Sequence, residues 1–394
     1  MSFRKRNVGL TGSAGADGTA QTPPAPQTPP KERVPLPGVR PSPLDGRPTT
    51  STGTASLDAL LAGHSGLALG SSILIEESGT TDYAGALLRF FAAEGLLQGH
   101  HVHVVGLPEH WGRELPGAVG ESEQKEKPAE HTEKMKIAWR YESLGQFGAG
   151  TNTRERQQTI PKQTAQNTEP GQAISVPFRH TFDLTKRLVH PASSKLDFVQ
   201  LGMNPSQSPY IPVLEHLQTS LTRSTTDTIH RIIIPSILSP ALYPPQSSQP
   251  QYILHFLHGI RSLLAAYPDR MIAIISLPLS LYPRSSGLVR WVELLNDGVL
   301  ELSPFPHSAD GDTQVSRGPA GTTEEPPQGL LQVHRLPILH DRGSGTGISE
   351  TDWTFTLSRR KFTIRPFNLP PIEGDTEAQQ ASADLKGKKS DMEF

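Results

Sequence analysis

SSILIEESGTTDYAGALLRFFAAEGLLQGHHVHVVGL, residues 71–107, is the stretch that decides the fold. Residues 71–77 are a short apolar run typical of a strand, and residues 102–107 are a second one. Between them, residues 83–97 carry apolar side chains at three- and four-residue spacing, which indicates a helix with one buried face. Strand, helix and strand in this order predict a βαβ unit, whose strands pair in parallel and whose helix covers the sheet.

The turn between that first strand and the helix consists of Ser78, Gly79, Thr80, Thr81 and Asp82. In phosphate-binding folds this turn holds the nucleotide, because its backbone amides and a lysine face the phosphates. If the pattern GxxxxGKS/T is aligned with Thr81 at its second glycine, Asp82 stands at the lysine position. If Gly79 stands at the second glycine instead, Thr80 stands at the lysine position. Neither alignment supplies a cation, and the first places an anion near the phosphates. We therefore expect a degenerate phosphate loop.

Nucleotide hydrolysis also needs an acidic residue at the end of a central strand, where it holds magnesium through water. The best central strands, RIIIPSIL at residues 231–238 and MIAIISLPL at residues 271–279, contain no Asp or Glu. Glu76 and Glu77 could stand in for a catalytic glutamate, but pairing with a nearby base is the interpretation we favour. Because the missing lysine and the missing acid each remove a large electrostatic contribution, we expect no catalytic residues and no hydrolysis by the chain alone.

The chain has 394 residues, with 37 Pro, 35 Gly and 35% hydrophobic residues. This composition favours one core domain of ~200 to 250 residues with long polar segments. A formal net charge of -2 excludes binding to nucleic acid or membrane by bulk charge alone. Without cysteine, the chain has neither disulfides nor thiolate metal sites. No apolar stretch reaches ~18 residues, so we expect a soluble protein of the cytoplasm and nucleus with no membrane partner.

Polar segments divide the chain into tails, insertions and one folded domain. Residues 1–47 and 372–394 are rich in small and polar residues, and we expect both to be disordered tails. The domain over residues 48–371 carries disordered insertions near 112–134, 148–175 and 306–328.

Helices and strands alternate through the second half of this domain. The predicted helices span residues 211–221, 252–267 and 288–295, and the predicted strands span residues 229–238, 271–277, 299–302 and 330–336. Alternation of this kind predicts an α/β fold with a parallel sheet that helices cover on both faces. Residues 353–370 alternate apolar and polar side chains on either side of a polar turn, which indicates a closing β-hairpin.

Two resemblances rest on particular motifs. TGTASLDALLAG at residues 52–63, followed by a loop rich in glycine and an apolar strand, is similar to the entry to the core of RecA-like ATPases. MKIAWRY at residues 135–141 and FDLTKR at residues 182–187 resemble the family formed by the fourth subunit of the eukaryotic Elongator complex. Generic RecA-like domains need neither of these segments, so the second resemblance is the more specific. Together the resemblances cover most of residues 48–370.

The family resemblance implies a RecA-like fold, with a parallel or mixed sheet flanked by helices. It also implies assembly with two paralogous RecA-like subunits, the fifth and sixth, into a hetero-hexameric ring. That ring would dock on the catalytic Elongator subassembly and support tRNA wobble-uridine modification by binding and releasing tRNA. The chain itself would need no cofactor, and ATP would be bound only at interfaces of the ring. There the chain could offer an arginine, for which Arg89, Arg113 and Arg261 are candidates.

The same resemblance implies a loop for RNA. In RecA-like rings, loops that leave the carboxyl ends of the central strands touch nucleic acid, and one such loop here contains Tyr282 and Arg284, with Arg290 just beyond. An aromatic ring can stack on a base while a guanidinium binds a phosphate, so we expect RNA contact at these three residues. Trp139 and Tyr141 in the KIAWRY segment could stack in the same way, although packing is the commoner role.

Histidines gather in HHVH at residues 100–103, where His101 and His103 would share one face of a strand. The sequence places no third ligand beside them, and His255 and His258, three residues apart on a helix, present the same difficulty. We therefore expect no metal site. Two other interpretations of the whole chain stay open: an active ATPase in its own right, and a stand-alone regulatory binding module.

Overall fold

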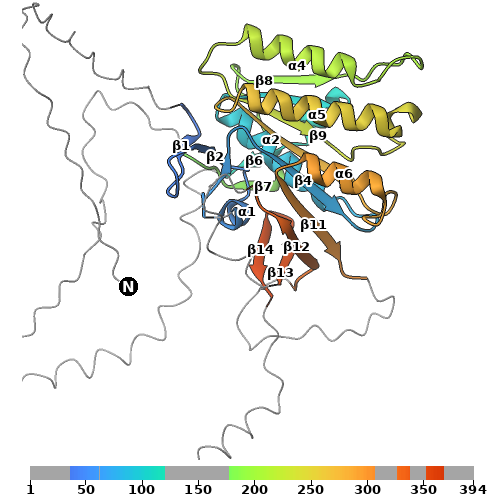
Figure 1. The fold of residues 1–394 in the computed structure, drawn as a ribbon. Coiled ribbons are helices and arrows are strands. Elements are labelled where there is room, and N and C mark those ends of the chain that lie inside the picture. The colour runs from blue at the N-terminus through green and yellow to red at the C-terminus, as the bar shows by residue number, and fades with distance from the viewer. Residues whose placement is uncertain (1–35, 62, 120–176, 307–325, 338–351, 368–394) are drawn as a thin grey trace, which may run out of the picture. The chain divides into compact units, whose positions relative to one another are not determined.

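The computed structural model of the chain describes residues 36–61, 63–119, 177–306, 326–337 and 352–367. Within these residues the main sheet has nine strands in the order β14-β13-β12-β11-β4-β10-β9-β5-β8 (Figure 1). Their bounds are β4 Ser72–Glu77, β5 His101–Val105, β8 Lys195–Val199, β9 His230–Ile234, β10 Met271–Pro278, β11 Gly298–Pro304, β12 Gly329–Arg335, β13 Trp353–Leu357 and β14 Phe362–Pro366. One smaller sheet contains β1 Val39–Pro41, β2 Pro48–Thr50 and β3 Leu67–Ala68. The other contains β6 Pro116–Ala118 and β7 Phe182–Arg187.

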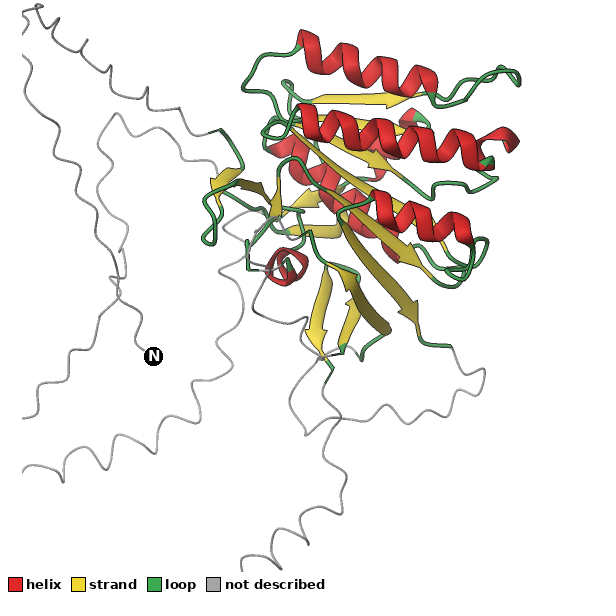
Figure 2. Cartoon of the chain, viewed as in Figure 1, coloured by secondary structure: helices red, strands yellow, loops and turns green. Residues whose placement is uncertain are grey.

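Helices cover both faces of the main sheet (Figure 2). The helices are α1 Ala55–Leu60, α2 Tyr83–Leu97, α4 Ile211–Arg223, α5 Pro250–Ala266 and α6 Gly287–Leu295, with short 3-10 turns at η1 Glu109–Glu114 and η5 Pro245–Ser248. Alternate residues of each strand point to opposite faces. Ile73 and Ile75 of β4 therefore pack in the layer that contains the apolar face of α2, whereas Leu74 packs in the layer that contains α4, α5 and α6.

The centre of the main sheet is parallel and one edge is antiparallel. Strands β11, β4, β10, β9, β5 and β8 pair in parallel, and β12, β13 and β14 each pair antiparallel to the strand before them. Strands β13 and β14 form the predicted C-terminal hairpin. The topology confirms the predicted mixed sheet flanked by helices, with a C-terminal β-hairpin.

The predicted βαβ unit of residues 71–107 is present, but its two strands do not pair. Helix α2 has the predicted bounds, and β4 and β5 lie in one sheet with β10 and β9 between them. The expectation of a direct pair is wrong because β10 is buried along residues 271–277 and pairs with a strand on both sides. A buried strand needs partners for the backbone groups along both of its edges.

Parts of two segments predicted to be disordered are folded. Strand β1 lies within the predicted tail of residues 1–47 and pairs with β2 through a turn at Gly46, whose φ of 73° favours glycine. Strand β6 lies within the predicted insertion near residues 112–134 and pairs with β7. Both expectations are wrong for these residues, because pairing with a distant strand orders them and composition does not report such pairing.

Other predicted features lie outside the described residues. These are the KIAWRY segment with Trp139 and Tyr141, the remainder of the tails, and the insertions apart from their ends. Across the part of the chain that the structure describes, no helix is both long enough and apolar enough to cross a membrane.

Candidate functional site at the end of strand β4

The carboxylate of Glu77 closes the turn that follows β4. Its Oε1 accepts hydrogen bonds from Thr81 Oγ1 at 2.7 Å and from the backbone N–H of Tyr83 at 2.9 Å. Its Oε2 accepts from the backbone N–H of Ala84 at 2.9 Å. Two oxygens that both face donors are typical of an ionised carboxylate. Glu77 therefore occupies the N-terminus of α2, where phosphate-binding folds place a phosphate.

The local sequence explains this arrangement. Asp82, the residue before α2, pairs with Arg89 at 3.1 Å and makes no side-chain hydrogen bond to the helix amides. Gly85 permits this side-chain position, since a Cβ there would lie 2.0 Å from Asp82 Oδ1. The first amides of α2 are then free for Glu77, and Gly79, at a φ of 94°, lets the chain turn between the strand and the helix.

This arrangement is electrostatically unfavourable for a phosphate. Burial raises the pKa of the Glu77 carboxyl and the charge of Asp82 adds to the rise, while the hydrogen bonds from Ala84, Thr81 and Tyr83 oppose it. A phosphate at this helix end would have to displace Glu77 and would meet the negative charge of Asp82. Of the predicted loop residues Ser78 to Asp82, Thr81 thus donates to an anion that the chain itself supplies.

Beside the turn, the guanidinium of Arg284 lies among three carboxyl groups. Its Nε is 2.8 Å from Glu293 Oε1 and 3.1 Å from Glu76 Oε2, and its Nη1 is 3.5 Å from Glu301 Oε2. His334 Nε2 is 2.7 Å from Glu301 Oε2 and 2.9 Å from Arg284 Nη1. Glu76 is therefore paired with a base, as the sequence interpretation favoured for both glutamates. For Glu77 that interpretation is wrong, because its carboxylate binds a hydroxyl and two backbone amides instead.

Burial dominates the titration of this cluster. The Glu76 side chain is fully buried, which raises its pKa to about 8; Glu293 and Glu301 raise it further and Arg284 opposes them. The hydrogen bond from His334 lowers the pKa of Glu301. Donor atoms of Glu76, Glu301 and His334 lie within 4.8 Å of one another, as a metal site requires. The guanidinium already lies among them, however, and its charge opposes a metal ion.

The three residues predicted to contact RNA have different environments. Tyr282 packs against the core layer of α4, α5 and α6, and Arg284 binds the carboxylates just described. Arg290 projects from α6 with 68% of its side chain exposed, and its contact with Glu293 is 3.5 Å long. Of the three, Arg290 offers the most accessible positive charge.

The arginines considered for a neighbouring ATP site are also separated. Arg89 on α2 forms ion pairs with Asp82 and Glu114 of this chain. Arg261 on α5 donates to the carbonyl oxygen of Leu294 at the end of α6, at 3.3 Å. Arg113 lies in η1 and lines a cleft beside β8.

Sequence reasoning missed Glu293, Glu301 and His334 as neighbours of Glu76. All three lie more than 200 residues away along the chain, and only the sheet order brings β11 and α6 beside β4. One signal was present, because Glu301 interrupts the apolar run VLEL of residues 299–302. A charged residue inside a buried strand indicates a partner that the sequence does not name.

Comparisons with known proteins find a family model, several relatives and a solved structure to which the chain is similar. A family model for "PAXNEB protein" matches residues 32–394. Several similar proteins bear the name Elongator complex protein 4. Among them, that of Schizosaccharomyces pombe is 34% identical over 360 residues, covering 88% of this chain and 91% of that protein. That of Saccharomyces cerevisiae is 30% identical, with coverages of 87% and 79%, and that of Homo sapiens is 28% identical, with coverages of 89% and 84%. Among solved structures, a KaiC-like protein from Pyrococcus horikoshii OT3 matches at 14% identity with a TM-score of 0.39, covering 81% of this chain and 99% of that chain.

Proposed function

The chain belongs to the PAXNEB protein family, and on that premise we propose that it serves in the Elongator complex as a non-catalytic RecA-like subunit. In this proposal it assembles with the fifth and sixth Elongator subunits into a hetero-hexameric ring of the cytoplasm and nucleus. The ring docks on the catalytic subassembly and supports tRNA wobble-uridine modification by binding and releasing tRNA. The names of the similar proteins in yeasts and human support a role within Elongator.

One observation carries the non-catalytic part of the proposal: the Glu77 carboxylate accepts hydrogen bonds from the first amides of α2. Those amides are the groups that would bind a β-phosphate. A chain whose own side chain fills this position gains nothing from ATP there. Any ATP in the assembly would therefore be held at interfaces of the ring, and this subunit needs no cofactor of its own.

An exposed apolar patch supports assembly. Trp291 and Leu294 lie three residues apart on α6, with 59% and 42% of each residue exposed, and Leu281 precedes the helix with 52% exposed. Residues at this spacing share one helix face. Large apolar side chains that share one exposed helix face, as Trp291 and Leu294 do, mark an interface more often than isolated ones do, and a paralogous subunit would cover them.

The RNA contribution is proposed at Tyr282, Arg284 and Arg290, with Arg290 meeting the phosphate. The carboxylates around Arg284 give it a positioning role in this loop, since they already satisfy its guanidinium. Salt sensitivity of tRNA binding by the ring, reduced in the variant Arg290→Ala, would support this assignment.

Co-expression with the fifth and sixth subunits tests the assembly. We expect the full chain to co-purify with both, at the mass of a hexamer by light scattering. The variant Trp291→Glu should be lost from the complex. Val189→Glu should be retained, because Val189 is 87% exposed and lies before β8, the edge strand of the main sheet, rather than on α6. A chain that stays monomeric with both partners present would instead support the stand-alone regulatory module.

A further inference from the structure

Four histidines and one aspartate meet on the face of the sheet that α4 covers. His101 and His103 come from β5, and the parallel register aligns His101 with His230 of β9 and His103 with Asp197 of β8. Helix α4 adds His216 above them. The cluster lies on the side of β9 away from β4, so it is separate from the site at the end of β4.

Three atoms of this cluster have the spacing of metal ligands. His103 Nδ1 is 3.3 Å from His216 Nε2, His216 Nε2 is 3.3 Å from Asp197 Oδ2, and His103 Nδ1 is 3.6 Å from Asp197 Oδ2. A tetrahedral zinc ion at roughly 2.0–2.1 Å from nitrogen and oxygen ligands holds those ligands roughly 3.4 Å apart. The three atoms therefore already surround a point at zinc-bonding distance.

The hydrogen bonds behind His103 orient it for this role. The Leu221 carbonyl can only accept, so the Ser224 hydroxyl donates to it and accepts from Arg270 and from His230 Nε2. His230 Nδ1 then accepts from His103 Nε2 at 3.0 Å. This assignment leaves His103 Nδ1 unprotonated, with its lone pair on the side of Asp197 and His216, and metal-binding histidines are usually fixed in this way.

The aspartate is held in a similar manner. His101 Nε2 lies 2.8 Å from Asp197 Oδ2 and can donate to it, and a carboxylate oxygen has a second lone pair for a metal. Such a partner fixes the orientation of a carboxylate ligand. His101 and His230 are thus supporting groups, and the three ligands come from β5, β8 and α4.

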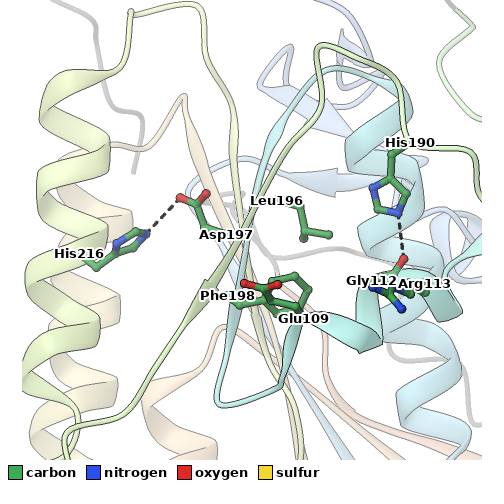
Figure 3. Close-up of a pocket in the computed structure, with 8 residues that line it drawn as sticks. All are labelled: Glu109, Gly112, Arg113, His190, Leu196, Asp197, Phe198 and His216. Carbon is green, nitrogen blue, oxygen red and sulfur yellow. Dashed lines mark hydrogen bonds and ion pairs between the residues drawn. The ribbon is translucent and has the colours of Figure 1, made fainter.

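The site is also open on one side. His103 is fully buried, whereas the side chains of Asp197 and His216 are 37% and 38% exposed. In Figure 3, Asp197 and His216 point toward each other at the rim of a cleft of about 620 Å³, and Arg113 and His190 lie across it. A metal ion can enter from this cleft and keep one position for water.

We propose that His103, Asp197 and His216 bind one divalent transition-metal ion, zinc, with water as the fourth ligand. Two imidazoles and a carboxylate are a donor set that zinc accepts, and a water in the fourth position completes a tetrahedron. The ion joins the edge strand β8 to β5 and to α4. Because binding requires all three elements in place, it stabilises this edge of the sheet.

Metal analysis of the full, tag-free chain tests the site. After treatment with a chelator and dialysis against zinc chloride, we expect one zinc per chain and a higher melting temperature. His216→Ala should weaken zinc binding by at least about tenfold and abolish the thermal shift. His216 is half-exposed on α4, so this variant keeps its core, and Asp197→Asn provides a second test of the same loss.

His255→Ala is the matched control, because His255 is an exposed helical histidine on α5. It should bind zinc as the wild type does. Cobalt in place of zinc should give the visible absorption of a tetrahedral ion in the wild type and not in His216→Ala. The proposal is overturned if the wild type binds no more zinc than His216→Ala, or if His255→Ala loses as much.

Discussion

Replacing Glu77 with glutamine tests the closed turn most simply, because the change keeps the shape of the side chain and removes its charge. Glutamine retains one carbonyl oxygen, so one of the two helix amides that Glu77 binds would face an NH2 group. A buried amide left without an acceptor costs ~1–3 kcal/mol. The lost interaction with the helix dipole adds ~0.3–1 kcal/mol. Burial of the charged carboxylate, which raises the pKa of Glu77, is itself unfavourable, and glutamine avoids it. We therefore expect the free energy of unfolding to fall by about 2 kcal/mol in total.

Urea unfolding of the full chain at neutral pH measures this loss. Glu77→Gln should shift the midpoint to lower urea without changing the slope. Glu215→Gln is the matched control, since Glu215 is exposed on α4, and it should change the free energy of unfolding by no more than about 0.5 kcal/mol. If Glu77→Gln were as stable as that control, the hydrogen bonds at the start of α2 would not hold the turn closed, and the reasoning would fail.

Three further predictions concern the buried framework and can be measured by the same unfolding assay. Arg231 is fully buried and donates to three neutral acceptors, so Arg231→Met should cost about 1–3 kcal/mol for each buried acceptor left without a donor, whereas the exposed Arg223→Met should cost little. Gly95→Ala should cost about 1–3 kcal/mol of stability, because the added Cβ would lie 2.5 Å from the Cδ of Arg231. Its control, Gly287→Ala, should be neutral, because the added Cβ would have no neighbour within 4 Å. Burial raises the pKa of Glu76 in the folded chain to about 8, from an ordinary value of 4.5. Its contribution to stability is therefore present below about pH 4.5 and is lost as the pH rises through 8, by at most about 5 kcal/mol. Glu76→Gln should remove this slope, and parallel stability curves for the two proteins would contradict the assignment.

Local patterns in the sequence predicted most individual elements. The bounds of α2 follow from the spacing of its apolar residues, and the hairpin of β13 and β14 follows from alternation around a polar turn. Strand β8 was missed because KLDFV is only five residues long, and an edge strand is buried on fewer sides. Its burial is mostly intermediate, so its sequence lacks the continuous apolar run of β9 or β10.

The order of the strands could not be predicted from local patterns. Nothing in residues 71–107 tells that β9 and β10, formed more than 100 residues later, come between β4 and β5. The same limit applies to the clusters of side chains. His101 and His103 were noticed as neighbours on one face, but Asp197, His216 and His230 reach them only through the sheet order and α4.

The turn after β4 shows what sequence reasoning can and cannot supply at a site. The absence of lysine between residues 78 and 83 is visible in the sequence and predicts weak phosphate binding. That Glu77 folds back to bind Tyr83 and Ala84 is not visible, because the pattern does not distinguish a glutamate that caps a helix from one that faces solvent.

A titration of the full chain alone with Mg-ATP measures whether the turn after β4 can bind a nucleotide, with an active P-loop ATPase titrated in the same way as a positive control. We expect no saturable binding up to millimolar ATP, because Glu77 fills the start of α2 and Asp82 stands where a lysine would bind phosphate. Saturable binding below about 1 mM, corresponding to roughly 4 kcal/mol of binding free energy, would show that a nucleotide displaces Glu77 and would contradict the account.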